Sequence, residues 1–282
     1  MNYKILITIF VVTFFLGCGS GGSDVESANQ PINYLTGDMV EITTPQEAKK
    51  AVSTVNSINA LSNSGSSTQS YAAPSRKSPS LAPVNNVEKC IDGGTLSVKG
   101  DVARNGVDLK TTYKECVKDS MRISGTTLTK GTFGSSEINL SVKMLNMEFK
   151  GSSSEITMQA TMDMLLNQEQ NLIDVSMDGK VTYSNVIDSG KAGYKNFRVV
   201  AQDGHLNMSG KVSMESENYA CSNGVYEIST IEELYPYGDG FSDGIMVING
   251  STFEFNDDGT VTVTFANGYS SVVEQGSDLV CH

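Results

Sequence analysis

Apolar and polar residues alternate along the chain from residue 90 onward. Clear examples are 95–98, 138–144, 156–164 and 261–265, where every second position is apolar. A period of two places one side of a strand against a core and the other against water, as in antiparallel sheets. The dipeptides that mark tight turns between such strands are Asn105-Gly106, Asp178-Gly179, Asp203-Gly204, Asp258-Gly259 and Asn267-Gly268.

This pattern predicts an all-β, mainly antiparallel fold over 88–282, with about eleven strands. Short connections favour a meander, either a large curved sheet or an open barrel. Two places interrupt the alternation. We expect 163–172 to form a short helical or looping segment, and Thr230 with Glu233 to cap a single helical turn before Pro236.

One segment, 44–62, has helical spacing instead. Thr44 is a suitable N-cap, Pro45 takes the first helical position, and Glu47 completes a capping box. We expect the apolar stripe of this helix to pack on the β domain, with a partner helix or the membrane surface as the alternatives. The stripe consists of Ala48, Ala51, Val52, Val55, Ile58 and Leu61.

Two polar stretches flank the predicted helix. Residues 18–43 begin with Gly and Ser, which predicts a flexible tether. Residues 63–87 are rich in Ser and Pro and poor in apolar residues, which predicts a second flexible linker.

The first seventeen residues have the form of a secretory signal peptide. Lys4 precedes an apolar run at 5–16, which is too short to span the ~30 Å hydrocarbon core of a bilayer. Gly17 and Cys18 end this run and resemble the lipobox of bacterial lipoproteins. An ordinary signal peptide that leaves Cys18 free is the alternative.

The lipobox resemblance implies that Cys18 carries a thioether-linked diacylglycerol and an N-acyl chain, and no other cofactor is expected. It also implies an outer-membrane location, because Gly19 stands where many lipoproteins of the inner membrane have Asp. The periplasmic face and the cell surface both remain open. Three acyl chains would hold the protein on the membrane far more firmly than one.

Four cysteines remain after Cys18. An even number in an exported chain predicts two disulfides. We favour Cys90–Cys116 and Cys221–Cys281, because each pair brackets a compact segment, although three connectivities are open. A zinc site is the weaker alternative, since the chain has no CxxC pair.

Three short stretches give a broader likeness. Residues 90–95, 111–116 and 226–230 resemble a loose group of uncharacterised β-rich proteobacterial envelope lipoproteins. This resemblance implies a signal, a small helix, a Cys-bounded hairpin and a β-rich remainder, and it implies no activity.

Charge is unevenly distributed. The chain has 20 Lys and Arg against 32 Asp and Glu, a net charge of −12. This excludes a broad electrostatic contact with nucleic acid. Residues 212–282 hold twelve of the acids and no Lys or Arg, so this part is expected to attract Ca²⁺ or a basic partner. Asp239 and Asp243 are weak calcium candidates, because their spacing does not match an EF-hand.

Methionine is concentrated in the middle of the chain. Its alternation with polar residues predicts one Met-rich sheet face, which is either an adaptable core or a deformable lining for an acyl chain or other apolar ligand. Copper(I) bound by thioethers is a weaker alternative. The architecture resembles the curved half-barrels of lipoprotein carriers. The candidate face consists of Met144, Met158, Met162, Met177 and Met208.

Catalytic motifs are few. The sequence has no phosphate-binding loop, and His205 is the one realistic histidine base. We therefore expect a non-enzymatic, membrane-anchored envelope lipoprotein that binds an apolar ligand or an envelope protein partner. The alternatives are an envelope hydrolase using His205 with nearby carboxylates, and a calcium-dependent adhesion or interaction module that uses the acidic C-terminal part.

Overall fold

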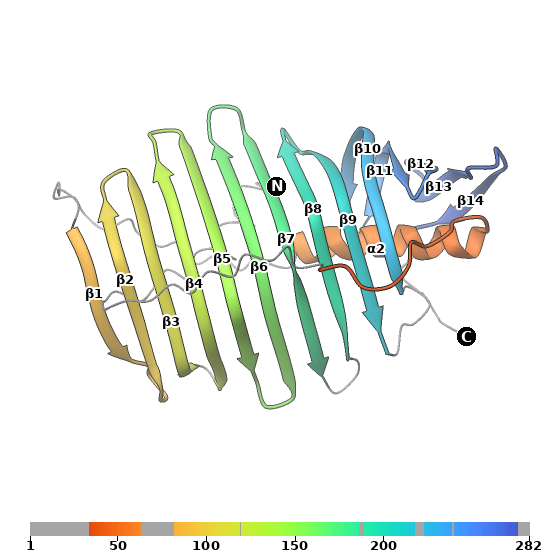
Figure 1. Cartoon of the computed structure of the whole chain (residues 1–282). Helices are drawn as coiled ribbons and strands as arrows, with labels where there is room; N and C mark the ends of the chain where they lie inside the picture. The colour runs from red at the N-terminus through yellow and green to blue at the C-terminus, as the bar shows by residue number, and fades with distance from the viewer. Residues whose placement is uncertain are drawn as a thin grey trace.

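The computed structural model describes residues 34–63, 82–118, 120–185, 189–217, 223–238 and 240–275. This part of the chain forms one helix, α2, and one sheet of fourteen strands (Figure 1). The elements are α2 Pro45–Asn63, β1 Ala82–Lys89, β2 Thr95–Ala103, β3 Gly106–Lys118, β4 Met121–Phe133, β5 Glu137–Lys150, β6 Ser154–Asn167, β7 Leu172–Asn185, β8 Ser189–Gln202, β9 His205–Ser216, β10 Gly224–Tyr237, β11 Gly240–Ile248, β12 Ser251–Phe255, β13 Thr260–Thr264 and β14 Ser270–Glu274.

The strands follow one another across the sheet in sequence order, and every neighbouring pair is antiparallel. The predicted meander is therefore confirmed. β1 and β14 form the two edges and are not paired with each other, so the sheet is open. Of the two predicted forms, the structure is the open sheet.

Several local predictions were wrong. The structure has fourteen strands instead of about eleven, and β1 occupies 82–87, which we had assigned to the linker. β1 pairs with β2 along its whole length, and an edge strand tolerates Pro83 because one side needs no donor. Residues 163–172 continue β6 and turn directly into β7, and 230–236 belong to β10.

The Asp178-Gly179 pair lies inside β7 and is not a turn, whereas the other four predicted turns each connect two strands. A β-bulge occurs here between β7 and β8, and the backbone amide of Asn196 donates to Asp178 Oδ1 over 2.7 Å. A Cβ on Gly179 would lie 2.4 Å from the Ala160 Cβ. Glycine is present because β6 approaches closely, and this is another common use of glycine within a strand.

The two sides of the sheet differ in chemistry. Residues directly opposite on neighbouring strands point to the same side, so the strand registers assign each side chain to a face. The apolar face carries Val142, Met162 and Met177, and the polar face carries Asp108 and Lys130. The alternation in the sequence therefore places apolar side chains on one face of the sheet and polar side chains on the other, as predicted.

Helix α2 lies on the apolar face of the C-terminal half of the sheet. Ala48, Val52 and Val55 are fully buried and share one core with side chains from β8 to β14. Phe253 and Tyr226 are among the largest buried side chains of this core. The prediction that the helix packs on the β domain is confirmed by these side chains, whereas those of Ile58 and Leu61 lie outside the described ones. No helix in the described part of the chain is long and apolar enough to cross a bilayer.

The two ends of the described chain help to fix this half. Residues 38–40 pair with Val225, with the Val40 amide donating to the Val225 carbonyl. Near the other end, the Gln275 side chain accepts from the Phe241 amide and donates to the Phe241 carbonyl. Asn56 of α2 donates to the Gln275 carbonyl over 3.2 Å. The helix is thus held by polar contacts as well as by apolar packing.

The start of α2 is a capping box, as predicted. The Glu47 amide donates to the Thr44 hydroxyl, and Glu47 Oε2 accepts from the amides of Thr43 and Thr44, both over 2.9 Å. These hydrogen bonds stabilise the ionised carboxylate, the one from the Thr43 amide most strongly, and they lower the pKa of Glu47 below its usual value.

We expect Glu47→Gln to lower the free energy of unfolding by about 0.5–1 kcal/mol at pH 7. Because the folded-state pKa is depressed, this stabilisation is present above the unfolded pKa and is lost as the pH falls through the folded value. Urea unfolding at pH 7 and pH 3 should therefore show the difference between the two proteins shrinking in acid. Glu41→Gln, at an exposed position outside the helix, is the control. An equal difference at both pH values would contradict this account.

Candidate functional site

The five candidate methionines all lie on the apolar face. The strand registers place them opposite other apolar side chains, so the face continues across several strands. The direct pairs are Met144 with Ala160, Met147 with Met158, Met162 with Met177, and Val199 with Met208.

Their burial divides them into two groups. Met208 is 2% exposed and belongs to the core beneath α2, so it does not line a ligand face. Met144 is equally buried, in a separate cluster, whereas Met158, Met162 and Met177 are half-buried. The ligand-face assignment of Met208 is therefore wrong, because the helix covers that end of the face.

Sequence reasoning missed other members of the cluster around Met144. Tyr113, Cys116 and Met147 are buried in it, and Phe149 packs against it. β-Bulges shift the alternation by one residue at Glu115 and Asn146, so Met147 and Phe149 share a face with even-numbered Met144. Burial raises the pKa of Tyr113 to about 12, which keeps its hydroxyl neutral.

Helix α2 covers one half of the apolar face, and no described helix covers the other half. Side chains of β8–β14 form the core with α2, and the helix contacts β11 and β14. Over β2–β7, two smaller clusters occupy the face, and no helix or strand among the described residues lies on them (Figure 1).

The central strands of this second half are uncharged on their apolar side. The registers place no Asp, Glu, Lys or Arg of β4–β7 on the apolar side. From normal strand dimensions, the face of these four strands measures about 14 Å across and about 43 Å along the strands. An apolar surface of this shape suits an elongated apolar molecule.

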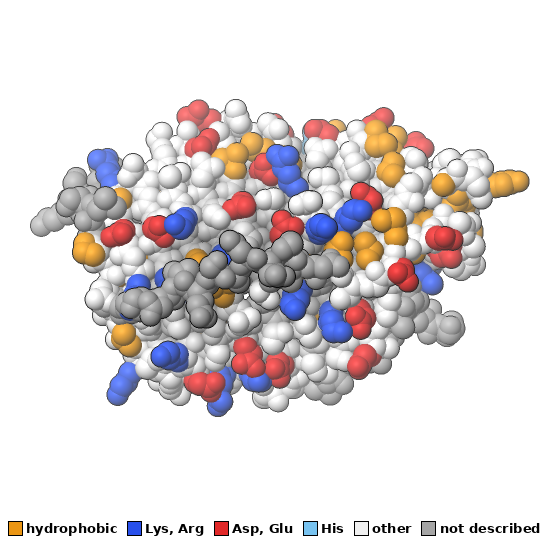
Figure 2. All heavy atoms as spheres, viewed as in Figure 1, with side chains coloured by type: hydrophobic (Ala, Val, Ile, Leu, Met, Phe, Trp, Pro, Cys, Tyr) orange, Lys and Arg blue, Asp and Glu red, His pale blue; other side chains and the backbone are white. Residues whose placement is uncertain are grey.

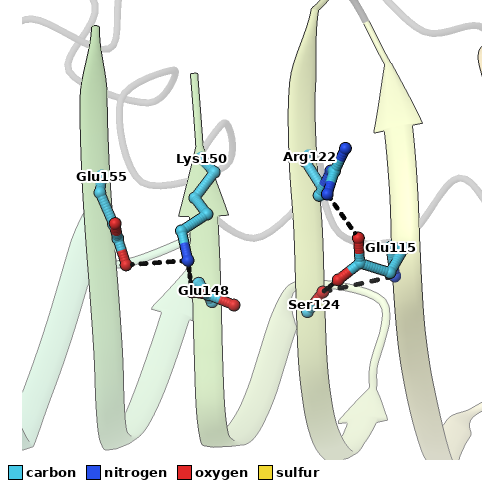
Figure 3. A network of polar contacts seen from close by, with 6 residues as sticks. All are labelled: Glu115, Arg122, Ser124, Glu148, Lys150 and Glu155. Carbon is cyan, nitrogen blue, oxygen red and sulfur yellow. Dashed lines mark hydrogen bonds and ion pairs between the residues drawn. The ribbon is translucent and has the colours of Figure 1, made fainter. Parts of the chain in front are cut away.

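The polar face carries the ion pairs of the described chain. Figure 2 shows acidic and basic side chains scattered together over one view of the molecule, and Figure 3 shows Lys150 between two glutamates and Arg122 beside Glu115. Ion pairs in contact with water contribute little to stability, so their main effect is to keep this face in water. The pairs are Glu115–Arg122, Asp108–Lys130, Glu148–Lys150, Glu155–Lys150, Glu215–Lys191, Asp174–Arg198, Glu227–Lys211 and Glu233–His205.

Two grooves are lined largely by polar-face residues. The larger has a volume of about 660 Å³ and includes Lys130, Asp163 and Arg198 in its lining. The Arg198 guanidinium makes a two-point contact with Asp174, and this hydrogen bonding raises the pKa of Arg198. The smaller groove has a volume of about 370 Å³ and includes Met158 and Lys180.

His205, the candidate base of the alternative hydrolase, has a carboxylate partner. Its Nδ1 lies 2.6 Å from Glu233 Oε2, and its ring packs on Tyr235 with centroids 4.3 Å apart. This geometry could hold one tautomer of the imidazole. Neither His205 nor Glu233 lines either of the two grooves.

The remaining predicted sites are partly outside the described residues. The Cys90–Cys116 disulfide is present, next to the buried cluster around Met144. Cys18, Cys221, Cys281 and the predicted signal segment 1–17 lie outside the described chain.

One of the two calcium candidates lies in the described part of the chain. Asp239 is outside the described residues, and Asp243 accepts a hydrogen bond from the Gly244 amide. Within the described ranges, no three or more His, Cys, Asp or Glu side chains are placed to share a metal ion.

Comparison with known proteins gives no family to which these features can be assigned. No protein-family model, curated protein or solved structure matches the chain.

Proposed function

We propose that this chain is a non-enzymatic, membrane-anchored lipoprotein of the outer envelope that holds an apolar ligand on the apolar face of β2–β7. The observation that carries the proposal is the unequal cover of that face. The strands present apolar side chains along the whole sheet, yet α2 packs only on the half formed by β8–β14.

The side chains of the half on which no described helix or strand lies suit an acyl chain. Met158, Met162 and Met177 are half-buried, unbranched and polarizable, so they can adapt to a flexible apolar molecule. The charge-free surface of β4–β7 offers no partner for a polar headgroup, which would extend beyond the strands toward water. The sequence supports the location, because Gly17-Cys18 resembles a lipobox.

Lipid that copurifies with the mature protein tests this proposal. We expect native mass spectrometry of the detergent-released protein to show non-covalent lipid, and solvent extraction to remove that lipid while the covalent chains on Cys18 stay. Replacing Met162 and Met177 with Gln places two polar amides on the face and should reduce bound lipid at least about tenfold.

Ile231→Gln with Val272→Gln is the matched control, because it makes the same kind of change at exposed positions outside this half. Circular dichroism should show that both variants are folded. If the wild-type protein carries no lipid, or if both double variants carry the same amount, the proposal is wrong.

A further inference from the structure

We propose that the polar face of β10–β14 is a docking surface for a basic segment of a partner protein. This surface lies on the opposite side of the sheet from α2. Helix α2 covers the apolar side of these strands, and among the described residues the polar side around Glu232 and Glu254 is exposed to solvent.

The strand registers place a continuous row of side chains across this surface. Glu232 of β10 is opposite Ile245, which is opposite Glu254 of β12. The row continues through Thr262 to Val272 at the edge strand β14. Glu232 and Glu254 are both exposed and sit two strands apart, which is about 10 Å at normal strand spacing.

Exposed apolar side chains occur beside these acids. Val272, Ile231 and Tyr237 are 62%, 61% and 76% exposed, and Tyr235 is 40% exposed with its ring tilted against His205. In Figure 2 hydrophobic side chains are most numerous toward the end of the molecule that holds the C-terminal strands, with acidic side chains among them. Tyrosine rings beside carboxylates favour Arg or Lys, because a cation interacts with both.

The charge of this region differs from that of the rest of the polar face. On β3–β9 acids stand beside bases, whereas no Lys or Arg occurs after Lys211. Among the described residues, Glu232 and Glu254 have no ion-pair partner. A basic segment would supply the missing charges, and an extended chain with a cation at every third residue repeats them about every 10 Å, as the row requires.

The test uses the full mature protein in a neutral detergent and a fluorescent peptide with Lys at every third position and Ser between. Fluorescence anisotropy should show binding that weakens as salt is raised. A peptide with Glu in place of Lys should not bind. Glu232→Gln with Glu254→Gln should raise the Kd of the Lys peptide at least about threefold.

Asp163→Asn with Glu169→Gln is the control, because it removes the same charge from exposed positions elsewhere in the sheet and its turns. It should leave the Kd unchanged. Equal affinity of wild type and the Glu232/Glu254 variant, or an equal loss in the control, would overturn the proposal. Copurified lipid should be the same in both variants, so the result is independent of the apolar-ligand proposal.

Discussion

Replacing Phe253 with Ala should lower the free energy of unfolding by about 3–5 kcal/mol. Phe253 is fully buried on β12, opposite Met246 and Val263, in the core that α2 completes. Its removal leaves a cavity among strands and helix that are fixed on all sides, so the core can collapse only in part. Urea unfolding at pH 7, followed by circular dichroism, measures the change.

Tyr269→Ala provides the control for this substitution. Tyr269 is 75% exposed in the turn between β13 and β14, so its removal should change the free energy of unfolding by no more than about 0.5 kcal/mol. Similar losses in the two variants would mean that α2 and β12 do not form the core described above.

Replacing Cys18 with Ser should abolish lipid attachment completely. The thioether forms on the sulfur of this cysteine in lipoproteins that have the lipobox, and a serine hydroxyl does not replace it. Each buried CH₂ of an acyl chain contributes about 0.8 kcal/mol to membrane binding, so the loss of all the chains would remove the predicted anchor. Metabolic labelling with an alkyne fatty acid, followed by dye coupling and electrophoresis, should give a labelled wild-type band and no band for the variant.

Ser20→Ala is the matched control, because it changes a neighbouring residue and leaves the Gly17-Cys18 pair intact. It should be labelled like the wild type. Fatty-acid label on the Cys18→Ser protein, or none on the wild type, would show that the N-terminus is not processed as a lipoprotein.

Sequence alone predicted the parts of the fold that depend on near neighbours. Two-residue periodicity gave the antiparallel meander, and Thr44 with Glu47 gave the capping box. The Cys90–Cys116 bridge was predicted because its residues bracket a short segment. Each of these signals involves residues that are no more than 26 positions apart in the sequence.

The features that the sequence did not predict depend on contacts between distant parts of the chain. The bulges at Glu115 and Asn146 change which side chains share a face, and no local pattern marks them. The loss of Met208 from the candidate site follows from where α2 docks, which involves strands about 150 or more residues later. The sequence could not distinguish Gly179 from a turn glycine, because the need for glycine comes from the close approach of Ala160 on the neighbouring strand.

The position of α2 at the start of the chain has a consequence for the order in which the two halves form. Strands β1–β7 pair only with sequence neighbours, so each hairpin can add to the previous one in order along the chain. Helix α2 is made before all of them, but its buried partners Phe253 and Val261 are made about 200 residues later. The apolar stripe of the helix therefore lacks its packing partners until the last strands have formed.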